Sequence, residues 1–181
     1  LKARDYKFTE EDYLLAAYNG FMAGVEACLD AGVKADALDP PARMFGDFGY
    51  NGALHYMAYF CSSPEEDESD ISRRRWAITR MVLERGGSID LMNDKCMTPL
   101  AMAIWQVNDT FARFLMDEGA SLTAEDMNGH RPLEVARRVL ERDNDYIRPR
   151  MEALVADIEG RMKEAGIPLV KPARPTSVWV C

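Results

Sequence analysis

The sequence has no long apolar run and no excess of positive charge, and each shortage excludes a class of protein. Its longest largely apolar stretch, 97–107, falls short of the roughly 20 residues that a membrane-spanning helix needs. Acidic residues outnumber basic ones, 30 against 22, for a net charge of −8, which argues against non-specific binding to nucleic acid. We therefore expect a protein partner, no nucleic acid and no transmembrane segment.

Cysteine is also scarce. Cys28, Cys61, Cys96 and Cys181 are spread along the chain without a Cys-x-x-Cys pair, which fits neither a disulfide framework nor a zinc site. The first residues contain no charged segment followed by an apolar one, so no signal peptide is expected. These features favour an intracellular, reducing compartment. The cytoplasm is the first choice, and an organelle reached after loss of an upstream targeting segment is the alternative.

Groups suited to catalysis are few. His55 and His130 are the two imidazoles of the chain, and no phosphate-binding loop, nucleophile elbow or His-Glu-x-x-His motif occurs. The acidic stretch 65–70 lacks the alternating ligand spacing of a calcium loop. We expect no enzyme activity, no cofactor, no metal site and no small-molecule substrate.

An internal repeat is present in the second half of the chain. The segment 98–103 (TPLAMA) recurs at a step of 33 residues as 131–136 (RPLEVA), with Pro, Leu and Ala in register. The same step separates the glycine pair at 86–87 from Gly119-Ala120. It also relates Ile78, Met81 and Val82 to Phe111, Phe114 and Leu115. One repeated unit accounts for all these matches.

This unit resembles the ankyrin repeat, in which a Thr-Pro-Leu-His turn opens a first helix and Gly-Ala follows a second one. Two upstream copies are similar, with 16–20 (AAYNG) in one and Leu54-His55 in the other. The resemblance implies an all-α solenoid of stacked helix pairs with hairpin fingers, and a structural hydrogen bond for His55. We place four repeats at about 8–41, 50–92, 94–125 and 127–166, hence a domain over 1–166 and a tail over 167–181.

Proline and glycine positions agree with this periodicity. Pro99 and Pro132 suit the first turn of a helix, where the backbone N–H has no partner within the helix. Gly32, Gly86 and Gly119 suit the left-handed residue that follows a helix. Phe111, Phe114 and Leu115 are spaced to line one helical face.

Two insertions enlarge the stack. The first lies within 39–50 and contains Met44, Phe45, Phe48 and Tyr50; these side chains either anchor a partner or fold back over the first repeat. The second lies within 54–86, a span longer than its counterpart 100–119, and contains the acidic segment 62–70. It forms either a solvated loop or a contact for a basic partner, tuned by phosphorylation at Ser63 or Ser69.

The C-terminal part departs from the repeat. Residues 143–145 (DND) interrupt a helix, and Pro149 begins another. Its apolar stripe is expected to be core under a polar capping face; the stripe consists of Met151, Leu154, Val155, Ile158 and Met162. The tail, with three prolines, either packs along the stack or reaches a neighbour, and 177–180 (SVWV) suits strand addition.

The resemblance also implies where a partner binds, namely on the fingers and on the exposed ends of the first helices. Equivalent positions there carry Tyr18, Tyr59 and Trp105, which predicts an aromatic ridge on the concave face; the alternative is that Phe60 and Trp105 belong partly to the core. The other predicted contact residues are Asn19, Met44, Phe45, Phe48, Asn51, Asp94, Lys95, Met97, Gln106, Met127, His130, Arg138 and Trp179.

These features predict a protein-interaction module that acts as a scaffold or adaptor subunit, within a large assembly. The alternative is a regulatory or inhibitory protein that reversibly occludes a single partner enzyme or transcription factor. Fold resemblance does not choose between them, because repeat stacks carry many unrelated functions.

Overall fold

The computed structural model describes residues 7–39, 49–59, 70–142 and 144–172, and these residues form eight helices and no strand. The all-α prediction is therefore confirmed for this part of the chain. The helices are α1 Glu10–Tyr18, α2 Met22–Asp30, α3 Ala53–Ala58, α4 Asp70–Glu84, α5 Pro99–Trp105, α6 Asp109–Asp117, α7 Pro132–Leu140 and α8 Arg148–Glu164.

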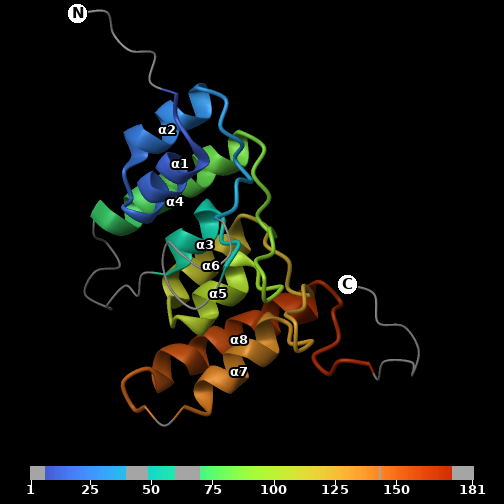
Figure 1. Cartoon of the computed structure of the whole chain (residues 1–181). Helices are drawn as coiled ribbons and strands as arrows, with labels where there is room; N and C mark the ends of the chain where they lie inside the picture. The colour runs from blue at the N-terminus through green and yellow to red at the C-terminus, as the bar shows by residue number, and fades with distance from the viewer. Residues whose placement is uncertain (1–6, 40–48, 60–69, 143, 173–181) are drawn as a thin grey trace, which may run out of the picture.

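The helices form two rows. Odd-numbered helices make one row, in which α1 contacts α3, α3 contacts α5, and α5 contacts α7. Even-numbered helices make the other row in the same order, and each odd helix also packs against the even helix that follows it. Figure 1 shows these pairs following one another from α1–α2 at one end of the molecule to α7–α8 at the other.

Helix boundaries follow the predicted proline and glycine positions. Pro99 and Pro132 each lie in the first turn of a helix, α5 and α7 respectively. Gly32, Gly86 and Gly119 have φ angles of 91°, 88° and 92°, so each adopts the left-handed conformation directly after a second helix. Both predictions are confirmed.

The hydrogen bonds of the connecting loops repeat at the step seen in the sequence. The backbone N–H of Ser88 donates to Asp36 Oδ1 at 2.7 Å, and that of Ser121 donates to Asp90 Oδ1 at 2.9 Å. Ser88 and Ser121 occupy equivalent positions of successive repeats, and each follows its helix-ending glycine by two positions. Each carboxylate therefore ties its own loop to the next one.

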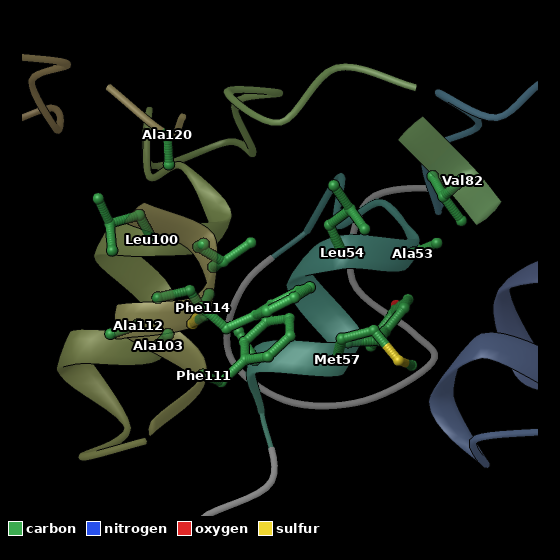
Figure 2. Packing of buried hydrophobic residues seen from close by; sticks show 14 of the residues in the cluster. Ala53, Leu54, Met57, Val82, Leu100, Ala103, Phe111, Ala112, Phe114 and Ala120 are labelled. Atoms are coloured by element: carbon green, nitrogen blue, oxygen red, sulfur yellow. The ribbon is translucent and has the colours of Figure 1, made fainter. Parts of the chain in front are cut away.

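The core lies between the two rows. Phe111 and Phe114 stack at 5.8 Å between ring centroids, and both are buried, as is Leu115. Figure 2 shows side chains of α5 and α6, among them Leu100 and Phe111, meeting Leu54 and Met57 of α3. The predicted helical face of α6 is thus confirmed.

The two ends of the molecule differ. At the first end, Leu15, Phe21 and Met22 expose between two fifths and three fifths of their surface. At the other end α8 is the longest helix, and its predicted apolar stripe is core: Met151, Leu154, Ile158 and Met162 are fully buried, and Val155 is half-buried. Ion pairs join this helix to α6, for example Arg113 to Asp157 at 2.7 Å.

Candidate functional site

A pocket of about 160 Å³ opens where the loops 93–97 and 126–130 meet helices α5 and α7. Six of the residues predicted as partner contacts line this pocket: Lys95, Met97, Trp105, Met127, His130 and Arg138. Asp126, Asn128 and Val135 complete the lining. Six of the eight predicted contact residues of the third and fourth repeats therefore converge on one site.

The loop 126–130 is held by the side chain of Asp126. Its Oδ1 accepts hydrogen bonds from the backbone N–H groups of Asn128 and His130, both at 2.8 Å. The N–H of Asp126 in turn donates to the carbonyl of His130 at 3.0 Å. This Asx-type turn is a local structure that aspartate and asparagine favour, so the rim of the pocket is fixed by its own sequence.

The loop 93–97 has the same construction one repeat earlier. Asn93 Oδ1 accepts from the N–H groups of Lys95 at 2.9 Å and Met97 at 3.1 Å. Asn93 is the counterpart of Asp126 in the preceding repeat, and the N–H of Met127 donates to the carbonyl of Lys95 at 2.9 Å. The two loops therefore form a connected frame around the pocket.

Left-handed backbone occurs at equivalent positions of these two loops and of the loop before α3. Tyr50, Cys96 and Gly129 have φ angles of 57°, 53° and 76°, and each lies four positions before the first leucine of its helix. Cys96 thus replaces glycine at a turn that needs a left-handed residue, as the alignment of the repeats indicates. An L side chain there adds strain.

Positive charge gathers around the pocket. The guanidinium of Arg138 lies against the His130 ring, with Nη1 at 3.3 Å from Nε2 and 3.5 Å from Nδ1. The guanidinium of Arg142 lies over the Trp105 ring, 4.1 Å from its centroid, and donates to the Trp105 carbonyl at 3.2 Å. These contacts hold the two arginine side chains at the edge of the site.

The three aromatic residues of the predicted ridge do not all lie at the pocket. Trp105 lines the pocket, whereas Tyr18 and Tyr59 occupy the ends of α1 and α3, half-buried against the core. The Tyr18 ring packs edge-on against Tyr56, with centroids 5.8 Å apart. Asn19 is exposed and Gln106 half-buried at the equivalent helix ends, and neither lines the pocket.

Asn51 is the clearest departure from the predicted contact surface. Its side chain is fully buried, and its Oδ1 accepts from Asn93 Nδ2 at 3.1 Å. It cannot face a partner, because it joins two loops inside the molecule. Asp94 is exposed beside the pocket and donates its N–H to the Gly49 carbonyl at 3.2 Å.

Several other predictions fall outside the described residues. These are the contact residues Met44, Phe45, Phe48 and Trp179, the alternative core residue Phe60, and the proposed phosphorylation sites Ser63 and Ser69.

His55 has a structural environment. It is fully buried, its Nδ1 accepts from the Gly52 N–H at 3.1 Å, and its Nε2 lies 2.9 Å from the Met97 carbonyl. A proton on Nε2 satisfies both contacts, so the neutral tautomer bridges the start of α3 to the pocket loop. Burial lowers the pKa of His55 to about 4, and the hydrogen bond to Met97 offsets this only in part.

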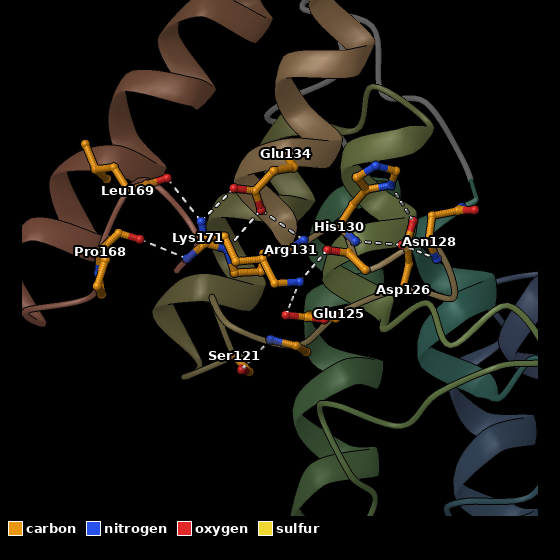
Figure 3. A network of polar contacts seen from close by, with 12 residues as sticks. Ser121, Glu125, Asp126, Asn128, His130, Arg131, Glu134, Pro168, Leu169 and Lys171 are labelled. Carbon is orange, nitrogen blue, oxygen red and sulfur yellow. Dashed lines mark hydrogen bonds and ion pairs between the residues drawn. The ribbon is translucent and has the colours of Figure 1, made fainter. Parts of the chain in front are cut away.

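The segment after α8 packs back on the stack. For residues 167–172, the first of the two alternatives for the tail, packing along the stack, is therefore the one observed. Arg131 donates to the carbonyls of Pro168 and Leu169 at 2.8 and 3.0 Å, and it forms an ion pair with Glu134 at 2.6 Å. Figure 3 shows this clamp, with Lys171 reaching the neighbouring loop, where it donates to the Gly129 carbonyl at 2.8 Å. Residues 167–172 thus form a strap over the last helix pair.

Electrostatics of the clamp favour the ion pair. Burial raises the pKa of Glu134, but the hydrogen bonds and charge of Arg131 outweigh it, and the net pKa is lowered. The N–H of Arg131 also donates to the Glu134 carboxylate at 3.0 Å, which is the half of a capping box that the third residue of the helix supplies. The Glu three positions after Arg131 is the sequence signal for this arrangement.

The described ranges contain neither a metal-ligand cluster nor a helix fit to span a membrane. There, no group of three or more His, Cys, Asp or Glu side chains has the geometry to hold a metal ion. No helix in those ranges combines the length and apolar character that crossing a bilayer requires.

A comparison with protein-family models finds no match for this chain, and a search of curated proteins finds none either.

Proposed function

We propose that this chain is an ankyrin-type protein-interaction module that acts as a scaffold or adaptor subunit in a multiprotein assembly, with the pocket between α5 and α7 as its principal contact. The observation that carries the proposal is the convergence of six register-predicted residues on that pocket. The repeated hydrogen bonds of Asn93 and Asp126 support the repeat assignment. No catalytic role is part of the proposal.

Preformed loops support binding as the task of this site. The Asx-type turns and the bond from Met127 to Lys95 keep the pocket rim formed without a ligand. A preformed site loses less conformational entropy when a partner binds. Met127, which exposes 56% of its surface, is the most accessible apolar group of the rim.

The test is affinity purification from native extract with mass spectrometry, comparing wild type with a Met127→Ser, Arg138→Ser double variant. The matched control is Met22→Ser with Arg73→Ser, which removes a similarly exposed pair on the outer helices α2 and α4. We expect one set of partners to disappear in the pocket variant and to persist in the control. Equal recovery in both would refute the pocket as the contact surface.

Native size then separates the two kinds of interaction module. Stable migration with a large complex supports the scaffold or adaptor. A free monomer that binds one enzyme or transcription factor reversibly would replace that proposal with the regulatory alternative.

A further inference from the structure

The size of the pocket limits what it can hold. Its volume of about 160 Å³ is close to the roughly 150 Å³ of an engineered cavity that accommodates benzene. Pockets for whole small-molecule ligands are larger, about 300–1,000 Å³. The pocket therefore has room for a single large side chain of a bound polypeptide.

The walls suit an apolar side chain. Trp105, Met97, Met127 and Val135 contribute apolar surface from both loops and both helices. Methionine has an unbranched, polarizable side chain that adapts to the shape of its neighbour. A leucine or phenylalanine side chain would meet such surface on several sides.

The rim has an excess of positive over negative side chains. In the described part of the chain, no carboxylate lies within ion-pair distance of Arg138, whose guanidinium lies against the His130 ring. Lys95 has only a 4.0 Å approach to Asp94, with both side chains partly exposed. Asp126 contributes a negative charge to the same lining, but its Oδ1 accepts two backbone N–H groups, its Oδ2 lies 3.3 Å from His130 Nδ1, and in the described part of the chain it forms no ion pair with Arg138 or Lys95.

This local charge is opposite to that of the whole protein. The chain has a net charge of −8, whereas the pocket lining carries two basic side chains, Lys95 and Arg138, against one acidic side chain, Asp126; Arg142 adds a further positive charge over the Trp105 ring. Non-specific attraction would bring basic peptides to an acidic protein. A preference for acidic peptides must therefore come from this rim.

We propose that the pocket binds an acidic peptide segment of a partner protein, which inserts one leucine or aromatic side chain beside Trp105 and places flanking carboxylates on Arg138 and Lys95. The proposal rests on the proposed function and adds the chemistry of the partner. A carboxylate on Arg138 would form a charge-assisted hydrogen bond, the stronger class of polar contact at an interface.

The experiment is a fluorescence anisotropy titration of the purified full chain with synthetic fluorescein-labelled hexapeptides. The first probe is Glu-Glu-Leu-Phe-Glu-Glu, the second has Lys in place of Glu, and the third has Ala-Ala in place of Leu-Phe. We expect the first to bind at least about 10-fold tighter than either of the others, and its affinity to fall as salt is raised.

Charge reversal locates the effect. Lys95→Glu with Arg138→Glu is expected to weaken the first probe by about 10-fold or more, whereas Arg73→Glu with Lys163→Glu, at exposed positions of α4 and α8, leaves it unchanged. Both variants carry the same net charge, and circular dichroism verifies that both are folded. Equal losses in the two variants, or tighter binding of either control peptide, would overturn the inference.

Failure here is distinguishable from failure of the proposed function. If the Met127→Ser, Arg138→Ser variant loses its captured partners but the acidic peptide has no advantage, the partner chemistry is wrong and the interaction module stands. If partner capture is unaffected and no probe binds, both proposals are refuted.

Discussion

Stability should depend on pH through the buried His55. The side chain is fully buried and bridges the Gly52 N–H and the Met97 carbonyl in its neutral form. Its pKa is lowered from 6.5 to about 4 in the folded protein. Because the unfolded chain binds this proton more tightly, acid favours unfolding as the pH falls from about 6.5 towards about 4.

The magnitude follows from the two pKa values. For a group that titrates at 6.5 unfolded and about 4 folded, the linkage relation gives a loss of about 2 kcal/mol between about pH 7.5 and about pH 5. Near pH 4 the loss approaches about 3 kcal/mol, since each pKa unit corresponds to about 1.4 kcal/mol. The contribution is fully present only above the unfolded pKa of 6.5.

The assay compares wild type with His55→Gln by urea unfolding at a series of pH values, followed by far-UV circular dichroism. Other titrating groups are common to both proteins, so the difference between the two profiles isolates His55. We expect the wild-type free energy of unfolding to fall by about 2 kcal/mol more than that of the variant between about pH 7.5 and about pH 5.

Parallel profiles would refute this account of His55. Should the variant not fold, long-range ¹H–¹⁵N correlation spectra of the wild type give the same information directly. They should show an Nε2–H tautomer that resists protonation down to about pH 5. A His55 signal that titrates near its ordinary pKa would contradict the burial argument.

Three further perturbations test the architecture by urea unfolding. Cys96→Gly should stabilise the protein by about 0.5–1 kcal/mol, because φ is 53° there, whereas Cys96→Ala keeps the strain and should give no gain. Thr79→Val should stabilise by about 1 kcal/mol, since its buried hydroxyl has no hydrogen-bond partner among the described residues; Thr79→Ala, which also loses a methyl group, should not. Arg131→Met should destabilise by about 2–3 kcal/mol and speed amide exchange in 167–172, and adding Glu134→Met should recover part of the loss. Each idea fails if the control behaves like the test variant.

Helix positions were predictable because they depend on local chemistry. A proline at 99 or 132 and a glycine at 86 or 119 act through their own backbone preferences, so their effect is visible in the sequence. The constant step between repeats then aligned the loops, which identified Lys95 and Met127 as neighbours of one surface. Most of this fold could therefore be predicted from local sequence signals that repeat at a fixed period.

The remaining features depend on contacts between distant residues. Asn51 was predicted at the surface, but its burial depends on Asn93, far along the chain in the next repeat, which no local pattern reveals. Tyr18, Tyr59 and Trp105 occupy equivalent positions, yet in the described part of the chain Trp105 lines the pocket between two loops under an arginine, whereas Tyr18 and Tyr59 are half-buried against the core. Equivalent sequence positions therefore differ in what surrounds them.

The unlike ends of the stack give the molecule a direction of unfolding. Each helix pair is held by its neighbours, so a terminal pair loses one interface and is the first to separate. At the end near α8, the Arg131 clamp ties the strap to the start of α7. At the end near α1, Leu15 and Phe21 remain exposed to solvent. We therefore expect opening to begin at α1–α2 and to proceed along the chain, with the pocket beside α7 in the part that opens last.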